Sequence, residues 1–313
     1  MSAVLKSSVP ADRLSPAHYT PARLPSAVRA YAGIPDTLVA GSPGKVGLLE
    51  LTFAQVGDRT DLVAHYQRSP LQVMRPLYVD PMMPGLPFVY IMSTGAGVLQ
   101  SDRLRMDIRA QAGASVFVTT QAATKVHRMD ADFGTQLVNI EAGPGTTVEY
   151  FPEPTIVFAR AKFYQRTVVT ADPSATVLIA DCFTAGRLAR GEVHEYDIYA
   201  SDFELRSPAG DLLVADRIRL ENGTVRGPGR FGDASLMASL YVVASGFEVA
   251  VLVEALNGHS SVRYGMSELP GNIGVWVRIL GDDPPAVQRA LAAAYDAARR
   301  ATVGAPLPDL RKG

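Results

Sequence analysis

Short apolar or alternating runs recur along the chain from Gly44 onward, and glycine, proline or aspartate residues separate them. Clear examples lie at residues 115–120, 146–151, 175–180 and 274–280. Almost none of these runs has the 3.6-residue period of an amphipathic helix, whereas their length and flanking turn residues are typical of β-strands. The pattern therefore predicts a body that is mainly β.

Two longer segments also have patterns that predict β-strands. Residues alternate regularly over positions 193–205, which predicts one extended strand. Residues 237–256 reach the length of a membrane span, but Glu248 and Glu254 fall inside the segment, and a carboxylate is costly in a bilayer. We interpret this segment as two strands joined by a turn at Gly246.

One segment near the end, at residues 284–301, has the pattern of an α-helix. Asp283 can cap its first turn and Pro284 fits the first helical position, while Gly304 and Pro306 would end it. The apolar stripe predicted to face the core consists of Val287, Leu291, Ala294, Tyr295 and Ala298. The positions assigned to the solvent side are Gln288, Arg289, Asp296 and Arg299.

Residues 1–43 contain six prolines and many small polar residues. Such a composition buries too little apolar surface to offset the chain entropy lost on ordering. We expect this segment to be a flexible leader. It has no apolar stretch long enough for a secretory signal.

The charge balance and the cysteine content of the chain exclude some classes of protein function. The chain has 313 residues with 30 basic and 31 acidic side chains, so it lacks the positive charge typical of nucleic-acid-binding proteins. Cys182 is the single cysteine, so no internal disulfide points to an oxidising compartment. We expect a cytoplasmic protein that binds neither nucleic acid nor a membrane.

A glycine turn offers one enzymatic alternative. Gly95 and Gly97 follow an apolar run at residues 88–92, as at the start of a dinucleotide-binding unit. Gln100 stands where the third glycine belongs, and residues 101–108 alternate with charges instead of opening an apolar-striped helix. A tight turn between strands is therefore favoured over a nucleotide site.

Carboxylates beside glycines or in apolar strands are the remaining candidates for chemistry: Asp102, Glu153, Asp181, Glu192 and Asp216. Asp181 follows the apolar run 177–180, and a carboxylate in a buried strand needs a cation, a hydrogen-bond donor or a metal to remain ionised. Taken singly, each acid is more often a turn former or an ion-pair partner. Grouped in space, they would offer oxygen ligands to a divalent cation.

Several strings, read in order, resemble the urease accessory protein UreD family, whose members are called UreH in some species. These strings are GLLEL at 47–51, SPLQVMRPLY at 69–78, the glycine turn before Asp102, TTQAATKVHR at 119–128, YFPEP at 150–154, Asp181 with GRLARGE at 186–192, and LVADR at 213–217. The chain departs from the family pattern at residues 95–101, where the usual run of glycines before the acid is thinned.

The resemblance implies a fold and a function. The fold is a single large all-β, solenoid-like domain over residues 44–308 that includes the helix at 284–301, followed by a tail at 309–313. The function is a non-enzymatic maturation factor that binds the urease apoprotein and, through UreF, recruits the GTPase UreG so that nickel reaches the urease active site. No tightly bound cofactor is implied; nickel(II) would bind transiently.

The resemblance also implies site residues. The candidates for the lining of an internal nickel passage, and for transient metal contact, are Asp102, Asp181 and Asp216, with Glu192 as a further lining candidate. Oxygen ligands that bind and release nickel suit a passage better than a thiolate cage. The simpler interpretation is that these acids brace neighbouring arginines. The candidates for contact with UreF or urease are Lys125, His127, Arg187 and Arg190.

Two alternatives from other classes remain open. One is a nucleotide-dependent enzyme that uses the turn at Gly95 and Gly97. The other is a β-solenoid module that binds protein or carbohydrate without any metal.

Overall fold

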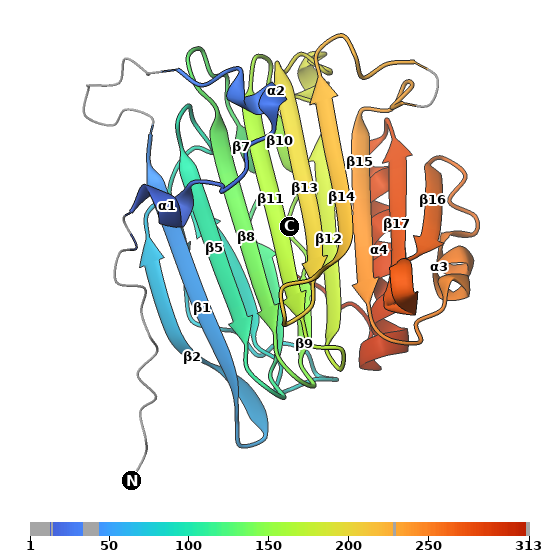
Figure 1. Cartoon of the computed structure of the whole chain (residues 1–313). Helices are drawn as coiled ribbons and strands as arrows, with labels where there is room; N and C mark the ends of the chain where they lie inside the picture. Colours follow the sequence, from blue (N-terminus) through green and yellow to red (C-terminus); the bar gives the residue numbers. More distant parts are fainter. Residues whose placement is uncertain (1–12, 14, 34–43, 228–229, 311–313) are drawn as a thin grey trace.

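The computed structural model describes residue 13 and residues 15–33, 44–227 and 230–310. Two β-sheets face each other in this part of the chain (Figure 1). The first sheet contains, in sequence order, β1 (Val46–Val56), β2 (Arg59–Arg68), β5 (Arg103–Ala110), β8 (Gly134–Ala142), β11 (Lys162–Ala171), β13 (Ile198–Arg206) and β14 (Leu212–Glu221).

The second sheet contains β3 (Leu71–Val73), β4 (Phe88–Ser93), β6 (Ser115–Thr120), β9 (Thr147–Tyr150), β12 (Thr176–Thr184), β15 (Leu236–Val243), β16 (Arg263–Glu268) and β17 (Gly274–Gly281). Two short strands branch from the same sheet: β10 (Thr155–Val157) pairs with β12, and β7 (Thr124–Val126) pairs with β10. The strands expected at 115–120, 146–151, 175–180 and 274–280 are all present, within a few residues at their ends.

The chain alternates between the two sheets from β5 to β13, and neighbouring strands within each sheet are parallel. Parallel neighbours cannot be joined by a tight hairpin, so the chain crosses to the opposite sheet before it returns. Each turn of the chain thus adds one strand to each sheet, which builds a stack of coils. The expected mainly β, solenoid-like fold with a C-terminal helix is confirmed.

Two hydrophobic cores explain the apolar composition of the strands. One core fills the space between the sheets, and the other lies between the second sheet and two helices, α3 (Val249–Leu256) and α4 (Pro284–Val303). Strand β12 serves both cores, because Val177 and Ile179 face the first core while Leu178 and Ala180 face the second. A strand buried on both faces is apolar at nearly every position.

Helix α4 has the predicted caps. The Asp283 carboxylate accepts a hydrogen bond from the Ala286 N–H at 3.1 Å, and Gly304 ends the helix with a φ of 77°. The predicted apolar stripe is buried. The assignment of Arg299 to the solvent side is wrong, since its side chain is fully buried and forms ion pairs with Glu149 and Asp80.

Two predicted strands are corrected. The second half of the segment at 237–256 forms helix α3 instead of a strand, and Leu252 and Leu256 bury one helical face. The strand predicted from position 193 begins only at Ile198. His194 has a φ of 58°, in the left-handed region that a β-strand does not use, so the alternation before Ile198 does not extend the strand.

Part of the predicted leader packs on the outer face of the first sheet (Figure 1). Helix α1 (Pro16–Tyr19) lies over β5, and α2 (Ser26–Arg29) lies over β11 and β13. Val28 is fully buried there. The expectation that this segment buries too little apolar surface therefore does not hold for the described residues 15–33; residues 1–12, 14 and 34–43 lie outside the described part.

A helix that crosses a bilayer must be both long and strongly apolar. In the described ranges, no helix is both long enough and apolar enough to cross a bilayer.

Candidate functional site

A cavity of about 220 Å³ lies between the two sheets. Its deeper walls come from the inward faces of β11 to β15, and the turns after β4 and β6 line it at the end of the molecule where β7 and β10 lie (Figure 1). Among the polar side chains that line it are Glu153, Gln165, Asp181, Ser201, Asp216 and Tyr241. The structure thus brings three of the five candidate acids, Glu153, Asp181 and Asp216, to one cavity.

Asp181 faces this cavity because it shares the inward face of β12 with Val177 and Ile179. The Gln165 side-chain amide donates a hydrogen bond to the Asp181 carboxylate at 2.9 Å, and the same amide nitrogen lies 3.1 Å from the Ser201 hydroxyl. Burial raises the pKa of Asp181 above its ordinary value, although the Gln165 hydrogen bond and the positive charge of Arg278 act in the opposite direction. Asp181 is therefore an acid with neutral hydrogen-bonding neighbours.

Asp216 has a different environment at the same cavity. Its Oδ2 accepts hydrogen bonds from the Tyr241 hydroxyl and the Arg278 guanidinium. Tyr241 is fixed by a stacked contact with Phe203, whose ring centre lies 3.7 Å away. Burial and the neighbouring Asp216 carboxylate raise the pKa of Tyr241 well above its ordinary value, so the hydroxyl remains a donor. Asp216 is thus braced by an arginine, and its charge contributes to the raised pKa of Asp181.

Asp102 does not line the cavity. Its carboxylate accepts hydrogen bonds from the backbone N–H groups of Gly44, Lys45 and Leu99, at 3.2, 2.9 and 2.9 Å. The residue is only 1% exposed. These contacts fix the loop before β5 to the start of β1, so the structure does not bring Asp102 to Asp181 and Asp216.

Glu192 also lies away from the cavity lining. It forms an ion pair with Arg187, whose Nε donates at 2.8 Å, and accepts from the Ala159 N–H at 2.7 Å. Burial opposes ionisation of this carboxyl, but Arg187 and the Ala159 N–H outweigh it and lower the pKa of Glu192. This contact matches the simpler interpretation, in which an acid braces an arginine.

The two strings expected to carry partner contacts meet at one aromatic ring. The His127 ring contacts Phe158 edge-on with ring centres 5.0 Å apart, and the Arg187 guanidinium lies 4.5 Å from the centre of the same ring. His127 also makes a hydrogen bond with the Ala96 carbonyl at 3.0 Å. Two of the residues predicted for partner contact, from distant parts of the sequence, therefore belong to one surface beside the cavity.

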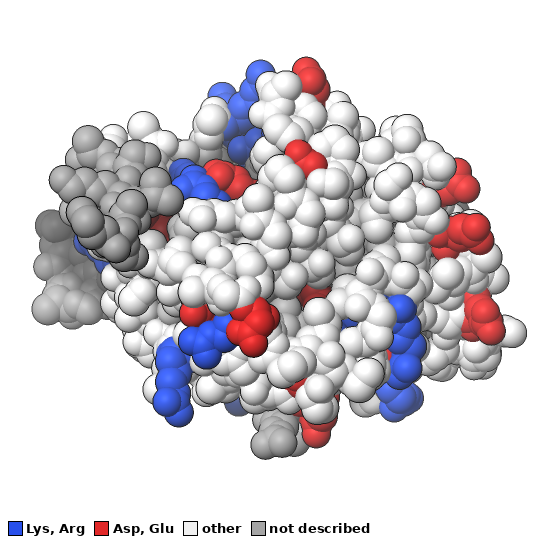
Figure 2. Space-filling view, turned by 90° about the horizontal axis from the view of Figure 1, so that it is seen from below, with Lys and Arg blue, Asp and Glu red and all other residues white. Residues whose placement is uncertain are grey.

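The other two residues predicted for partner contact are exposed. Lys125 lies on β7 and lines the cavity entrance, while Arg190 ends a short 3-10 helix, Leu188–Arg190. On the face at the opposite end of the molecule, Lys, Arg, Asp and Glu are scattered among mostly other residues (Figure 2).

The turn at Gly95 and Gly97 has a structural explanation. Gly97 has a φ of 137°, and a Cβ atom at this position would lie 2.2 Å from the Lys125 carbonyl oxygen. The chain then enters strand β5, not a helix whose N-terminus could receive a pyrophosphate. This geometry does not favour the nucleotide-dependent alternative.

Sequence reasoning missed the neutral and basic side chains around the two acids. Gln165, Ser201, Tyr241 and Arg278 come from four different strands, and no motif connects them. Tyr241 on β15 and Arg278 on β17 lie on the same inward face of the second sheet, because Arg278 pairs with Ser239, two residues from Tyr241. The pairing that brings Arg278 to Asp216 depends on how the sheets stack.

The fold and the cavity define a β-solenoid-like protein with a polar, partly acidic interior space. Comparison with known proteins specifies the family. The chain matches the model of the UreD urease accessory protein family over residues 45–312, and it belongs to that family.

Similar curated proteins cover nearly the whole chain. Urease accessory protein UreD 2 of Streptomyces griseus subsp. griseus is 49% identical, over 90% of this chain and 99% of the relative. Urease accessory protein UreD of Natronomonas pharaonis is 38% identical, over 87% and 93%. Urease accessory protein UreD 2 of Brucella suis biovar 1 is 33% identical, over 89% and 95%. The family resemblance seen in the sequence is confirmed, and with it an accessory role connected with urease.

Proposed function

We propose that this protein is a maturation scaffold that binds the urease apoprotein and UreF, recruits UreG through UreF, and lets nickel(II) move through its internal cavity. It performs no catalysis of its own in this account. The family membership supports the connection with urease, and the cavity supplies a space lined by oxygen ligands.

The proposal depends mainly on the environment of Asp181. It faces the cavity, and within the described part of the chain it forms no ion pair, unlike Asp216 and Glu192. A buried carboxylate without a fixed counter-ion costs stability, so a transient cation is a favourable partner for it. Oxygen ligands from a carboxylate, an amide and hydroxyls bind a divalent cation more reversibly than thiolates do.

Asp216 is expected to cooperate with Asp181 in a different way. Its ion pair with Arg278 compensates its charge when no cation is near, so we expect it to contribute less to cation binding than Asp181 does. Asp102 and Glu192 have their carboxylates occupied by backbone N–H groups or by Arg187, and we assign them a supporting structural role.

Partner binding is proposed for the surface beside the cavity entrance. Lys125 on β7 lines the cavity, His127 and Arg187 both contact the Phe158 ring beside it, and Arg190 ends the neighbouring 3-10 helix. Loops held by a rigid β scaffold are common recognition sites. Contact at this position would bring UreF or urease close to the end of the cavity, where a cation could enter or leave.

A gene deletion in a urease-positive host tests the proposal. We expect the deletion to abolish urease activity at limiting nickel and the wild-type gene to restore it. Asp181→Ala should restore much less activity while still co-purifying with urease and UreF, whereas Asp211→Asn, at an exposed acid, should restore activity fully. Full urease activity in the deletion strain would contradict the maturation role, and full restoration by Asp181→Ala would contradict the role of that residue.

A further inference from the structure

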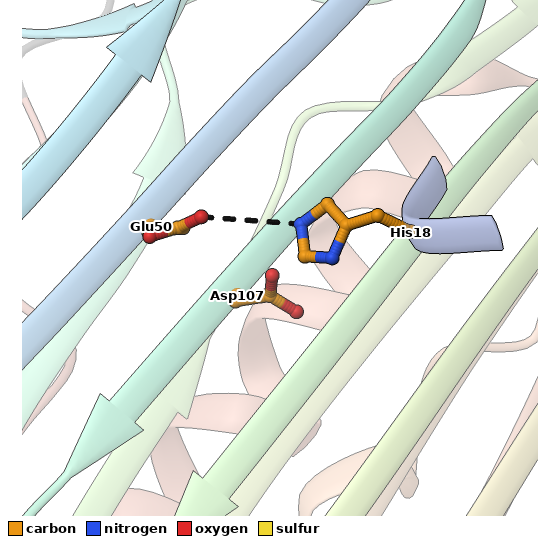
Figure 3. A group of neighbouring side chains, drawn as sticks. All are labelled: His18, Glu50 and Asp107. Carbon is orange, nitrogen blue, oxygen red and sulfur yellow. Dashed lines mark ion pairs between the residues drawn. The ribbon is translucent and has the colours of Figure 1, made fainter. Parts of the chain in front are cut away.

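A second group of metal-ligating side chains lies on the outer face of the first sheet. Glu50 on β1 and Asp107 on β5 are paired neighbours in the parallel register, so their side chains lie side by side. His18, from α1, reaches over them from the N-terminal segment (Figure 3). Each of the three offers one ligand atom, and these atoms all lie within 4.8 Å of one another.

His18 presents an available nitrogen to the two acids. Its side chain is 12% exposed, and Nε2 lies 3.9 Å from Oε1 of Glu50, the contact drawn in Figure 3. Within the described part of the protein, this nitrogen has no hydrogen-bond partner. Arg105 fixes the segment by donating a hydrogen bond to the His18 carbonyl oxygen.

Two arginines balance the negative charges of Glu50 and Asp107. Arg13 binds both oxygens of Glu50 at 2.8 Å, and Arg105 binds Asp107 at 2.7 Å. These contacts orient the carboxylates while leaving further lone pairs on their oxygens. Arg13 is the more displaceable of the two, because it belongs to the N-terminal segment and already contacts the Tyr66 ring at 4.0 Å.

We propose that His18, Glu50 and Asp107 bind one divalent transition-metal cation of the Ni²⁺ or Zn²⁺ class, which holds the N-terminal segment against the sheet. One imidazole nitrogen and two carboxylates favour such cations over Mg²⁺ and Ca²⁺, which prefer oxygen ligands alone. Metal–ligand distances of about 2.0 to 2.2 Å require the three ligand atoms to move inward by roughly 1 Å. A short surface segment can make that movement.

This site is independent of the cavity. It lies on the outer face of the first sheet, where none of its three residues lines the space between the sheets. Binding here therefore requires neither Asp181 nor any urease partner. Its chemical role is to couple the position of the N-terminal segment to the concentration of the metal.

Titration of the untagged full-length chain with Ni²⁺, Zn²⁺ and Mg²⁺ by calorimetry tests the proposal. We expect His18→Ala to lose one equivalent of Ni²⁺ or Zn²⁺ binding. His259→Ala, at a histidine far from the cluster, and Asp181→Asn should retain that equivalent. The same stoichiometry and affinity in the wild type and His18→Ala would overturn the proposal.

A second variant separates metal binding from loss of local structure. Arg13→Gln removes the cation that competes for Glu50, so it should tighten Ni²⁺ binding several-fold, whereas a purely structural role for the cluster predicts no gain. Hydrogen exchange of residues 15–33 should slow on addition of Ni²⁺ in the wild type and stay unchanged in His18→Ala. Unaltered exchange in the wild type at saturating Ni²⁺ would also overturn the proposal.

Discussion

Asp181 and Glu192 show how their surroundings give two acids opposite properties. Burial raises the pKa of Asp181 despite its hydrogen bond from Gln165, whereas Arg187 and a backbone N–H lower the pKa of Glu192. A raised carboxyl pKa means that the ionised form costs stability in the folded state, and a lowered pKa means that it contributes stability. The ionised Asp181 carboxylate therefore costs folding stability, and a functional role explains its presence better than a structural role does.

Asp181→Asn should raise the free energy of unfolding by about 1 kcal/mol at neutral pH. The amide removes the buried charge, and its carbonyl oxygen can still accept from Gln165. The folded-state pKa is raised, so the cost of ionisation is absent below the ordinary pKa of Asp and complete above the folded-state value. Urea denaturation across pH should therefore show the gain shrinking toward acid; a loss of stability at neutral pH would contradict this assignment.

Glu192→Gln is the matched contrast. This variant should lower the free energy of unfolding by about 1 kcal/mol at neutral pH, because it removes a charge-assisted bond to Arg187. The contribution of a carboxyl with a lowered pKa is lost as pH falls through that pKa, so this variant and the wild type should converge at acid pH. Opposite signs for the two variants at pH 7 are the expected result.

For single residues, the sequence indicated that a buried acid requires compensation, but it did not identify the side chain that provides it. The apolar run before Asp181 indicated a buried acid that requires hydrogen bonding or a cation, and Gln165 fills part of that need. Arg299 could not be predicted in the same way. A helical wheel assigns arginine to solvent, and the buried acids that hold Arg299 come from elements distant in the sequence.

Arg299 ties α4 to the second sheet at the level of whole elements. Its guanidinium binds Glu149 on β9 at 3.0 Å and Asp80 in the loop before β4 at 2.9 Å, and it also donates to the Pro306 carbonyl oxygen. Burial raises the pKa of Glu149 to about 7, so this acid relies on Arg299 to remain ionised. One side chain thus joins the helix, a strand, a loop and the segment after the helix.

Arg299→Ala should lower the free energy of unfolding by about 3 to 5 kcal/mol, since it leaves buried carboxylates without a cation. Arg300→Ala is the matched control, because the neighbouring side chain is exposed and pairs with Asp296 one turn away. Its effect should stay within about 0.5 kcal/mol. Thermal or urea unfolding measures both, and equal effects would show that the buried cluster does not anchor α4.

The loop at the cavity entrance depends on Gly97. A side chain there would meet the Lys125 carbonyl, so Gly97→Ala should cost about 2 to 4 kcal/mol and weaken co-purification with UreF. Gly113→Ala should cost about 1 kcal/mol, because its φ is also positive but no neighbouring atom lies within 4 Å. Comparable losses for the two variants would contradict a tightly packed entrance.

Elements were predictable where local pattern and tertiary context agree. The strands after Gly113 and Gly145 and the capped helix α4 follow from alternation, turn residues and capping. Helix α3 does not, because the segment 249–256 is apolar at most positions and fits either period. Its packing against α4 selects the helix. The positive φ of His194 is likewise invisible in an alternating pattern.

At the scale of the whole molecule, the stacked coils create the space between the sheets. Asp181 and Asp216 belong to strands of different sheets, so only the facing of β12 and β14 brings them to one cavity. Long-range pairing of this kind is not encoded in any local period. The family resemblance supplied the expectation that the acids converge, and the structure satisfies it for these two and not for Asp102 or Glu192.

The nickel content of urease reports whether the metal passes through the cavity. Urease would be purified at limiting nickel from deletion strains complemented with the wild type, Asp181→Asn or Asp211→Asn, and its bound nickel would be measured by mass spectrometry. We expect full loading with the wild type and Asp211→Asn, and several-fold lower loading with Asp181→Asn despite normal levels of both proteins. Equal nickel in all three preparations would contradict passage of the metal through the cavity.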